Sequence, residues 1–176
     1  DTRKTPPGLR VLEKYAVRCG GGHCHRIGLF DAVLIKDNHI AGTPIAELPL
    51  VISAAAAKAR SLGNSRNTPL TFIEVEVDTI EQFDALLTLP IGTIDIILLD
   101  NMGPELLRAA AARRDSNNPD LQLESSGGVT LDTVSVLATT GVDRISVGGL
   151  THSAVSLDVA LDVIETRNAT APETRL

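Results

Sequence analysis

The sequence predicts an α/β fold in which about six parallel strands form a TIM-like barrel, and three observations support this prediction. Short apolar runs alternate with helical patterns along the 176 residues, without hairpin signals between them. Only 2% of the residues are aromatic although 43% are hydrophobic, which suits parallel strands covered by helices. Polar residues end strand after strand, which favours a barrel with one mouth over a doubly wound sheet with one switch point.

The first elements follow from periodicity and from helix-end signals. Apolar residues recur on one face from Leu9 to Cys19, which predicts a helix that ends at Gly20. The apolar run 32–36 predicts a strand, and Pro49 begins an Ala-rich helix that extends to Leu62. A further strand is expected at the very start of the chain.

The rest of the chain repeats the order of strand and helix within one domain. Asp78 and Glu81 resemble a capping box at the start of a helix, and Pro104 is a favourable first residue for the next one. The expected strands cover 72–77, 94–99, 121–124 and 144–147, and the expected helices cover 78–89, 104–114, a segment after Thr130, and 154–166. We assign the barrel to residues 1–167 and a loose tail to residues 168–176.

The charge distribution points to a local anionic ligand. Residues 1–39 contain seven Lys and Arg against four Asp and Glu, a net charge of +3. Because the whole chain has a net charge of −6, the other 137 residues carry −9. Such a local positive segment on an acidic chain, with few aromatic residues for stacking on bases, argues against a nucleic-acid partner. Arg10, Lys14 and Arg18 are interpreted as a solvated helix face.

Cysteine content and hydropathy indicate a cytoplasmic protein without a membrane partner. Cys19 and Cys24 lie in a chain with no secretory leader, so we expect reduced thiols. No apolar run approaches the roughly 18 residues that a membrane-spanning helix needs. The chain begins at Asp1 without an initiator Met, so we expect a fragment of a longer protein.

Two glycine loops join strands to helices and suggest a phosphate site. Glycines allow backbone N–H groups to approach a phosphate, and a following helix N-terminus adds a positive dipole end. Either loop alone is more often a simple turn, but two loops on the last two strands match a recurring phosphate site of barrels. The residues concerned are Ser126, Gly127, Gly128, Gly148, Gly149 and His152.

Two carboxylates at the ends of adjacent strands are candidate Mg²⁺ ligands. Glu76 and Asp100 could share the ion with waters and ligand oxygens. Alternatively, they form structural salt bridges to Lys36 or Arg3. Glu74 points to the same side of its strand as Glu76 and could be the functional carboxylate instead.

Basic residues near the start of the chain could converge on a ligand with several negative charges; they are Arg3, Lys4, His25, Arg26 and Lys36. A zinc site at His23, Cys24 and His25 is disfavoured, because adjacent side chains rarely coordinate one ion and no second pair has finger-like spacing. No pattern supports Cys24 as a nucleophile. His39 is interpreted as a hydrogen-bonded histidine at the barrel rim.

At these residues the sequence resembles the quinolinate phosphoribosyltransferase family. The matching stretches, in order over residues 1–153, are DTRKTPPGLRVLEKYAVRCGGGHCHRIGL, LIKDNHI, EVEVDT, ILLDNM, ESSGGVT and GVDRISVGGLTHS. The resemblance implies the open barrel of type II phosphoribosyltransferases, without the family's N-terminal domain. It also implies a cytoplasmic, Mg²⁺-dependent pentosyltransferase of NAD biosynthesis. Such an enzyme joins quinolinate to 5-phosphoribosyl-1-pyrophosphate and gives nicotinate mononucleotide, pyrophosphate and CO₂.

The resemblance also implies residue roles. Quinolinate carboxylates would be bound by Arg3, His25, Arg26 and Lys36, with Lys4 nearby on a carboxylate or the pyrophosphate. Glu76 and Asp100 would hold ribose hydroxyls and Mg²⁺, and the catalytic set would be Lys36, Glu76 and Asp100. The 5′-phosphate site would be lined by Ser126, Gly127, Gly128, Gly148, Gly149 and His152.

The sequence departs from the family in ways that leave alternatives open. Cys24 stands where the family commonly has Asn, TRKTPPG replaces TRKTTPG, and GGL replaces GAL. The family's N-terminal domain closes a neighbouring subunit's site in a homodimer or higher oligomer, so we expect this chain alone to be inactive or very weak. The alternatives are a related pyrophosphorylase such as the ModD group, and a non-catalytic phosphate-binding barrel.

Overall fold

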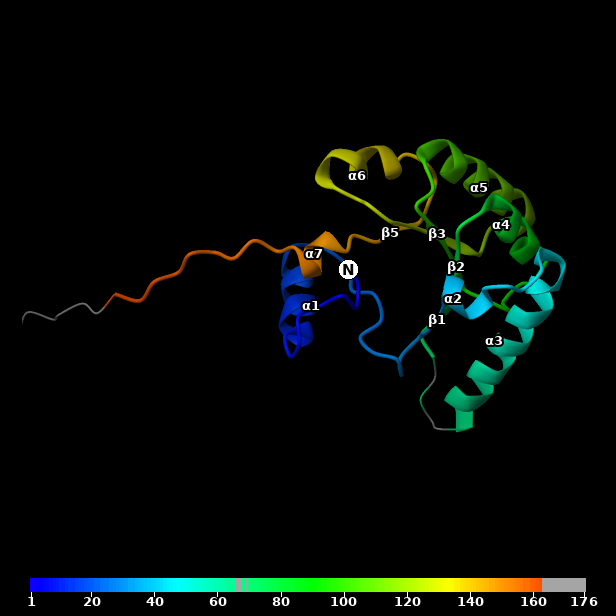
Figure 1. Cartoon of the computed structure of the whole chain (residues 1–176), viewed down its shortest axis with the longest axis horizontal. Helices are drawn as coiled ribbons and strands as arrows, with labels where there is room; N and C mark the ends of the chain where they lie inside the picture. The colour runs from blue at the N-terminus through cyan, green and yellow to red at the C-terminus, as the bar shows by residue number, and fades with distance from the viewer. Residues whose placement is uncertain (66–67, 69, 163–176) are drawn as a thin grey trace, which may run out of the picture.

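The computed structural model describes residues 1–65, 68 and 70–162. In this part of the chain, five parallel strands form one sheet in the order β1-β2-β3-β4-β5, so each strand pairs with its neighbours in sequence. The sheet is open, because β1 and β5 are its two edges (Figure 1). The strands are β1 (Val33–Ile35), β2 (Ile73–Val77), β3 (Ile96–Asp100), β4 (Gln122–Ser126) and β5 (Arg144–Ile145).

The helices lie on two sides of this sheet. Helices α3 to α6 follow its outer, convex side, whereas α1 contacts α7 on the other side, near the start of the chain (Figure 1). The helices are α1 (Arg10–Cys19), α2 (Asp37–Ile40), α3 (Leu48–Ser65), α4 (Ile80–Leu87), α5 (Pro104–Asn117), α6 (Leu131–Leu137) and α7 (Gly149–His152), with a 3₁₀ turn η1 (Ile45–Glu47) before α3.

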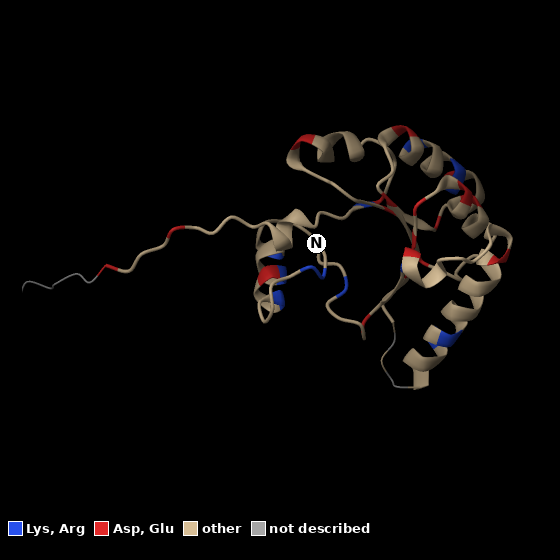
Figure 2. Ribbon diagram, viewed as in Figure 1, with Lys and Arg blue, Asp and Glu red and all other residues tan. Residues whose placement is uncertain are grey.

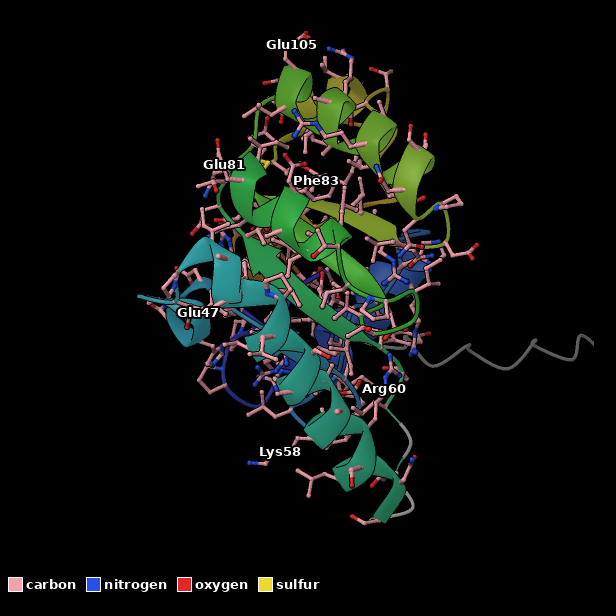
Figure 3. All side chains as sticks on the ribbon, turned by 90° about the vertical axis from the view of Figure 1, so that its right-hand side faces the viewer. Glu47, Lys58, Arg60, Glu81, Phe83 and Glu105 are labelled. Atoms are coloured by element: carbon pink, nitrogen blue, oxygen red, sulfur yellow. The ribbon has the colours of Figure 1, made fainter. Side chains whose placement is uncertain are left out.

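The hydrophobic core lies between the outer face of the sheet and α3, α4 and α5. Alternate strand residues such as Val75, Ile97 and Leu123 belong to the same buried cluster as Phe83 and Leu107 of the helices. Figure 3 shows Phe83 among the side chains between α4 and the sheet, while the labelled acidic residues and Lys58 extend outward. Burial of these aliphatic and aromatic side chains is the main stabilisation of the sheet and its outer layer.

The inner face of the sheet is polar. Because side chains alternate along a strand, Glu74, Glu76 and Glu124 point away from the helices, and all three are buried. The strand register places Glu76 opposite Leu98, and Asp100 opposite Ser126, at the carboxyl ends of neighbouring strands. The fold therefore directs acidic groups into the barrel and toward its mouth.

The expected strand at the start of the chain is not formed. Residues 1–5 form no ladder; instead, the Asp1 carbonyl accepts a 3.4 Å hydrogen bond from the Ser146 hydroxyl, and the hydroxyls of Thr2 and Thr151 lie 3.2 Å apart. Since β5 has only two residues, it offers little edge for another strand to pair with. Side-chain hydrogen bonds hold this segment in place of a sixth strand.

The expected last helix is also wrong over its described part, because residues 154–162 form no helix. Val155, Leu157, Val159 and Leu161 are 83–95% exposed, and a short helix is marginal without a packed apolar face. Residues 163–166 of that prediction, the proposed boundary at residue 167 and the tail 168–176 lie outside the described residues.

The capping box before α4 lies one residue later than expected. The Thr79 hydroxyl accepts from the Gln82 N–H (3.2 Å), and the Gln82 side-chain oxygen accepts from the Thr79 N–H (3.3 Å). Asp78 and Glu81 are therefore not the capping pair. Among the described residues, no helix has the length and apolar character to cross a membrane.

Candidate active site

A pocket of about 320 Å³ opens at the carboxyl ends of the strands and brings together most of the predicted site residues. Its walls combine the start of the chain, the loop before β1 and the inner face of the sheet. The predicted residues that line it are Arg3, Lys4, His25, Arg26, Lys36, Glu76, Asp100 and Ser126. Figure 2 shows basic residues on the segments near the N-terminus and acidic residues among the strands and the turns after them.

Two arginines of this pocket lack carboxylate partners. Arg3, Lys4 and Arg26 form no ion pair with a described residue, and the buried Nε of Arg3 has no hydrogen-bond partner there. Burial and the nearby Arg3 guanidinium lower the pKa of Arg26, which shows that two cations lie close together. An anion between them would relieve this repulsion and supply the missing acceptors.

Lys36 and Glu76 form the ion pair that the sequence left open. The Nζ atom of Lys36 lies 2.7 Å from Oε2 of Glu76, with the Lys36 side chain 45% exposed and the Glu76 side chain 9% exposed. The Lys36 backbone N–H donates to Nδ1 of His39 (2.8 Å), so His39 is a hydrogen-bonded residue at the rim. Lys36 is thus oriented over the pocket while its head stays accessible.

Carboxylates gather at the ends of β2 and β3. Asp100 accepts a 2.7 Å hydrogen bond from the Asn101 side chain, and burial together with the nearby Asp37 and Asp100 raises the pKa of Asp78. Sequence reasoning did not select Asp37 and Asp78 as site residues, although each stands directly after a predicted strand, 32–36 and 72–77 respectively. Carboxylate oxygens at a pocket rim are a donor set that suits Mg²⁺, which usually takes one or two carboxylates together with ligand oxygens.

The two glycine loops lie beside this pocket. Gly127 has a φ of +95°, and a Cβ there would collide with the Asn101 side chain, so only glycine fits where β4 ends. Gly127 and Gly128 line a separate hollow of about 290 Å³ with residues of α5 and α6. Of the first predicted loop, Ser126 therefore lines the pocket, whereas Gly127 and Gly128 do not.

The second loop begins α7. A Cβ at Gly148 would lie 3.0 Å from Nε2 of His152 and 3.9 Å from Thr2 Cγ2, so this glycine allows the His152 ring to approach the start of the chain. Nδ1 of His152 lies 2.7 Å from the Ser153 hydroxyl. Gly149 is the first residue of α7, and a Cβ added there would have no other atom within 4 Å.

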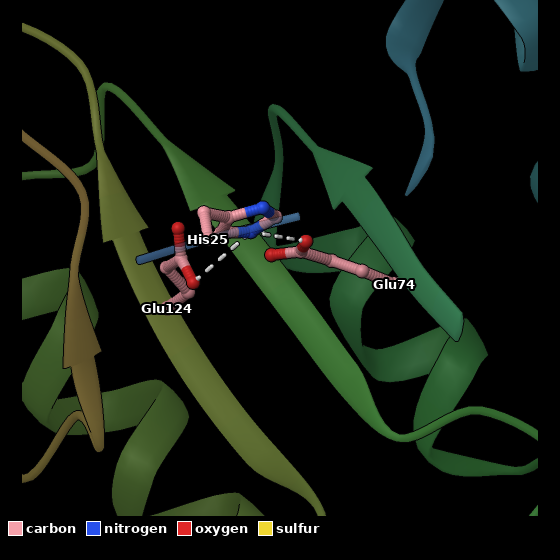
Figure 4. A group of neighbouring side chains, drawn as sticks. All are labelled: His25, Glu74 and Glu124. Carbon is pink, nitrogen blue, oxygen red and sulfur yellow. Dashed lines mark ion pairs between the residues drawn. The ribbon is translucent and has the colours of Figure 1, made fainter. Parts of the chain in front are cut away.

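His25 lies between two buried glutamates of the inner face (Figure 4). Its Nε2 is 2.8 Å from Oε2 of Glu74 on β2 and 3.6 Å from Oε2 of Glu124 on β4. Burial and the Glu74 charge raise the pKa of Glu124, although the nearby His25 and Ser146 side chains act against this. Glu124 was missed by sequence reasoning, yet its position two residues before Ser126 places it on the same strand face.

Lys14 corrects the interpretation of a solvated helix face. It is only 4% exposed, and its Nζ lies 2.9 Å from each carboxylate oxygen of Asp1 and 3.0 Å from the His25 carbonyl oxygen. The Cys24 thiol donates to the Lys14 carbonyl (3.3 Å), which gives this departure from the family pattern a hydrogen-bonding role. Arg18 is exposed, as expected.

Comparisons with known proteins identify relatives of this chain. The family described as quinolinate phosphoribosyl transferase, C-terminal domain, matches residues 1–162. A nicotinate-nucleotide pyrophosphorylase (carboxylating) from Mycobacterium leprae is 47% identical over 165 residues, which are 93% of this chain and 52% of the relative. The protein of the same name from Rattus norvegicus is 35% identical over 174 residues, 99% of this chain and 54% of the relative.

Solved structures give the same result for the fold. The nicotinate-nucleotide pyrophosphorylase of Francisella tularensis superposes with a TM-score of 0.71 at 39% identity, over 90% of this chain and 50% of that one. NadC from Streptococcus pyogenes superposes with a TM-score of 0.66 at 37% identity, over the same shares. The chain therefore spans about half the length of the relatives that it matches.

Proposed function

The chain belongs to the quinolinate phosphoribosyltransferase family, and we propose that it forms the C-terminal part of an enzyme that transfers phosphoribosyl to quinolinate. The donor would be 5-phosphoribosyl-1-pyrophosphate, and the products nicotinate mononucleotide, pyrophosphate and CO₂. The observation that carries the proposal is the pair of guanidinium groups without carboxylate partners, Arg3 and Arg26, in one pocket with Lys36 and a rim of carboxylates.

The cations suit a substrate with two carboxylates. Each guanidinium can bind a carboxylate with two parallel hydrogen bonds, and Lys36 adds a point charge that the substrate can share with Glu76. Lys4, which lines the same pocket, would contact a carboxylate or the departing pyrophosphate. Binding in this way would hold the ring nitrogen in a fixed direction relative to the sugar.

The carboxylates suit the sugar and its metal. Loss of pyrophosphate leaves positive charge on the ribose ring, which fixed anions such as Glu76 and Asp100 would stabilise. The same two residues would hold Mg²⁺, which when bound neutralises charge on the pyrophosphate oxygens. After the ring nitrogen attacks, the pyridinium stabilises the carbanion left by loss of CO₂, so no enzyme nucleophile is required.

The 5′-phosphate would be held near the two glycine loops. Ser126 lines the pocket directly, and Gly127 and Gly128 follow it at the turn into α6. Gly148, Gly149 and His152 of the second loop lie beside Thr2. Backbone N–H groups of such loops and the His152 ring are donors that suit a phosphate.

The complete protein is proposed to be a cytoplasmic homodimer or higher homo-oligomer. Its relatives are about twice as long as this chain, and the additional length would include the domain that closes the site. A ModD-like reaction would use the same barrel with another acceptor, and a non-catalytic barrel would bind the phosphoribosyl compound without turnover. Binding of quinolinate separates the proposal from the first alternative, and turnover by the complete protein separates it from the second.

The test is a calorimetric titration of quinolinate into the complete protein and into this chain. We expect binding that weakens at least about tenfold in Arg3→Gln and Arg26→Gln, because each loses charged hydrogen bonds to a carboxylate. Arg108→Gln is the matched control, since Arg108 pairs with the exposed Glu105 away from the pocket. Failure of the complete protein to bind quinolinate, with the phosphoribosyl donor present or absent, would contradict the proposal.

A further inference from the structure

The turn after β3 contains a residue with an unusual backbone. Asn101 has a left-handed conformation (φ +52°), and it is the one non-glycine residue with a positive φ in the described part of the chain. Asparagine tolerates this conformation better than most residues, but a strained backbone persists only where its surroundings fix it. Because Asn101 directly follows Asp100, the contacts that fix it also bear on the candidate active site.

The backbone of Asn101 is held from both sides. Its N–H donates to the Ser126 carbonyl (2.9 Å), which adds one hydrogen bond beyond Asp100 and Ser126, the last pair of the ladder between β3 and β4. The next residue, Met102, is 7% exposed and belongs to the hydrophobic core. The chain thus passes from the pocket to the core within three residues, and the left-handed turn at Asn101 makes this change of direction.

The side chain of Asn101 lies between the end of β3 and the first glycine loop. Its Nδ2 donates to Oδ2 of Asp100 (2.7 Å). Its Oδ1 occupies the space that a Cβ of Gly127 would need, so the glycine allows the amide to pack against the backbone of the loop. One side chain therefore contacts both the Asp100 carboxylate and the turn that follows Ser126.

This contact leaves one oxygen of Asp100 available for a ligand. Oδ2 accepts from Asn101, whereas Oδ1 accepts no hydrogen bond from the residues that the structure describes. A hydrogen bond to one carboxylate oxygen restricts rotation of the group, so the other oxygen keeps a fixed direction. Asp100 and Ser126 line the pocket and Asn101 does not, so Asn101 can act on a ligand only through these two neighbours.

We propose that Asn101 is a positioning residue, which holds the Asp100 carboxylate at a fixed orientation and distance from the loop 126–128. The two groups that it joins would bind different parts of one molecule, the ribose with its Mg²⁺ at Asp100 and the 5′-phosphate at the loop. A fixed spacing between them favours productive binding of the phosphoribosyl donor. The inference deepens the proposed function and rests on it for the identity of the donor.

The test titrates 5-phosphoribosyl-1-pyrophosphate with Mg²⁺ into the complete protein by calorimetry and adds steady-state kinetics. Asn101→Gly removes the amide but adopts a positive φ readily, so its melting temperature should stay within about 4 °C of the parent. We expect donor binding about tenfold weaker and a donor KM about tenfold higher, with the KM for quinolinate changed by less than about twofold. Asn117→Ala is the matched control, since its amide donates to the Arg113 carbonyl (2.8 Å) at the exposed end of α5, and it should change neither value.

Asn101→Ala separates the amide from the backbone turn. This variant also loses the amide, but it keeps a Cβ on a left-handed backbone, so it should be less stable than Asn101→Gly and bind the donor as weakly. If donor binding weakens in Asn101→Ala and not in Asn101→Gly, only the turn matters and the positioning role is wrong. A loss for quinolinate as large as that for the donor would also overturn it, because it would show a general disturbance of the pocket.

The outcomes for this inference and for the proposed function are distinct. If the complete protein does not bind quinolinate but Asn101→Gly weakens donor binding, the proposed acceptor is wrong and the positioning role stands. If quinolinate is converted but Asn101→Gly binds the donor as tightly as the parent, the positioning role is wrong and the function stands. A complete protein that does not bind the donor contradicts both.

Discussion

The outer helices of the sheet bury large apolar side chains, whereas the described segments at the two ends of the chain bury none. Ile52, Phe83 and Leu107, on α3, α4 and α5, are fully buried. On α1, Leu12 is 64% exposed, and in the stretch after α7, Leu161 is 95% exposed. The outer helices thus bury apolar residues against the sheet, whereas α1 and the stretch after α7 bury none of theirs; of the end segments, residues 1–4 line the pocket.

The wall formed by the end segments is fixed by polar contacts instead. The buried Lys14–Asp1 pair, the Cys24 thiol and the contact between Thr2 and Thr151 hold α1, the loop before β1 and α7 together. Burying such groups has a large desolvation cost, so their net contribution is smaller than that of an apolar core of similar size. The pocket therefore combines a firmly packed acidic side with a basic side that is more easily disturbed.

The largest expected effect on the free energy of unfolding comes from truncating a leucine to alanine on an outer helix, compared with the same substitution on α1. Leu107→Ala should lower the free energy of unfolding by about 2–5 kcal/mol, because it leaves a cavity in the core. Leu12→Ala should change it by no more than about 0.5 kcal/mol, because that side chain is mostly exposed. Urea unfolding of both variants measures the difference, and equal losses would show that α1 is as well packed as α5.

Two adjacent arginines of α5 give the next largest difference. Arg114 donates to the carbonyls of Leu121 (2.9 Å) and Gly141 (3.1 Å) and to Asp143 (2.6 Å), and it is 7% exposed. Burial lowers the pKa of Arg114, but its hydrogen bonds to Asp143 and Asp115 outweigh this and raise it overall. The guanidinium joins α5 to the turns before β4 and β5.

We expect Arg114→Gln to cost about 2–3 kcal/mol in unfolding free energy, because buried carbonyls and a carboxylate lose their donors. Arg113→Gln is the control, since its pair with Asp84 (2.5 Å) is about half exposed and should be worth at most about 1 kcal/mol. Thermal unfolding of the two variants compares them. A loss at Arg113 as large as that at Arg114 would contradict this account of burial.

The pH dependence of the free energy of unfolding tests the cost of burying Glu124, which lies on the polar inner face between the two regions. Its raised pKa means that the unfolded state releases this proton at lower pH than the folded state does. The folded state is therefore penalised as pH rises above the ordinary glutamate range, and the penalty disappears below that range, where both states are protonated.

We accordingly expect Glu124→Gln to stabilise the protein at neutral pH, with a gain that shrinks as pH falls through the unfolded-state pKa. Unfolding free energies measured across the acidic range follow this gain. The Asp132→Asn variant, on the exposed first turn of α6, is the control for a general change in charge. A gain that is constant with pH would show that burial of the charge is not its cause.

The smallest effect on stability is expected at the pocket mouth. Lys36→Ala removes a partly exposed ion pair and should cost at most about 1 kcal/mol of unfolding free energy. In the complete enzyme it should nevertheless abolish turnover, because Lys36 faces the proposed substrate. Steady-state kinetics and thermal unfolding of the same sample check both halves, and an unchanged rate would refute the role of Lys36.

The strands and the outer helices could be predicted from the sequence because their signals are local. Apolar runs such as 94–99 and the helix-starting Pro104 are tied to backbone geometry that does not depend on distant residues. The helix expected over 154–166 failed over 154–162 because a favourable pattern does not provide a surface to pack on. The burial of Lys14 was equally hidden, since its partner Asp1 is brought to it by the tertiary fold.

Much the same division holds for the candidate site. Residues at the carboxyl ends of strands, such as Lys36, Glu76 and Asp100, could be placed at one mouth from sequence alone, and the structure brings them into one pocket. The surroundings of His25 could not, because Glu74 and Glu124 lie on strands 49 and 99 residues away from it. Spacing along one strand identifies a shared face but does not tell which loop covers it.

The contacts that complete the pocket span almost the whole described chain. Each strand pairs with the strand made just before it, so the sheet can grow in step with synthesis at the ribosome. The pocket cannot, because Asp1 and Thr2 meet Ser146 and Thr151 across separations of 145 and 149 residues. A nascent chain that ends before residue 151 would lack the contact between Thr2 and Thr151, so we expect the wall built from residues 1–4 to be fixed only after the sheet has formed.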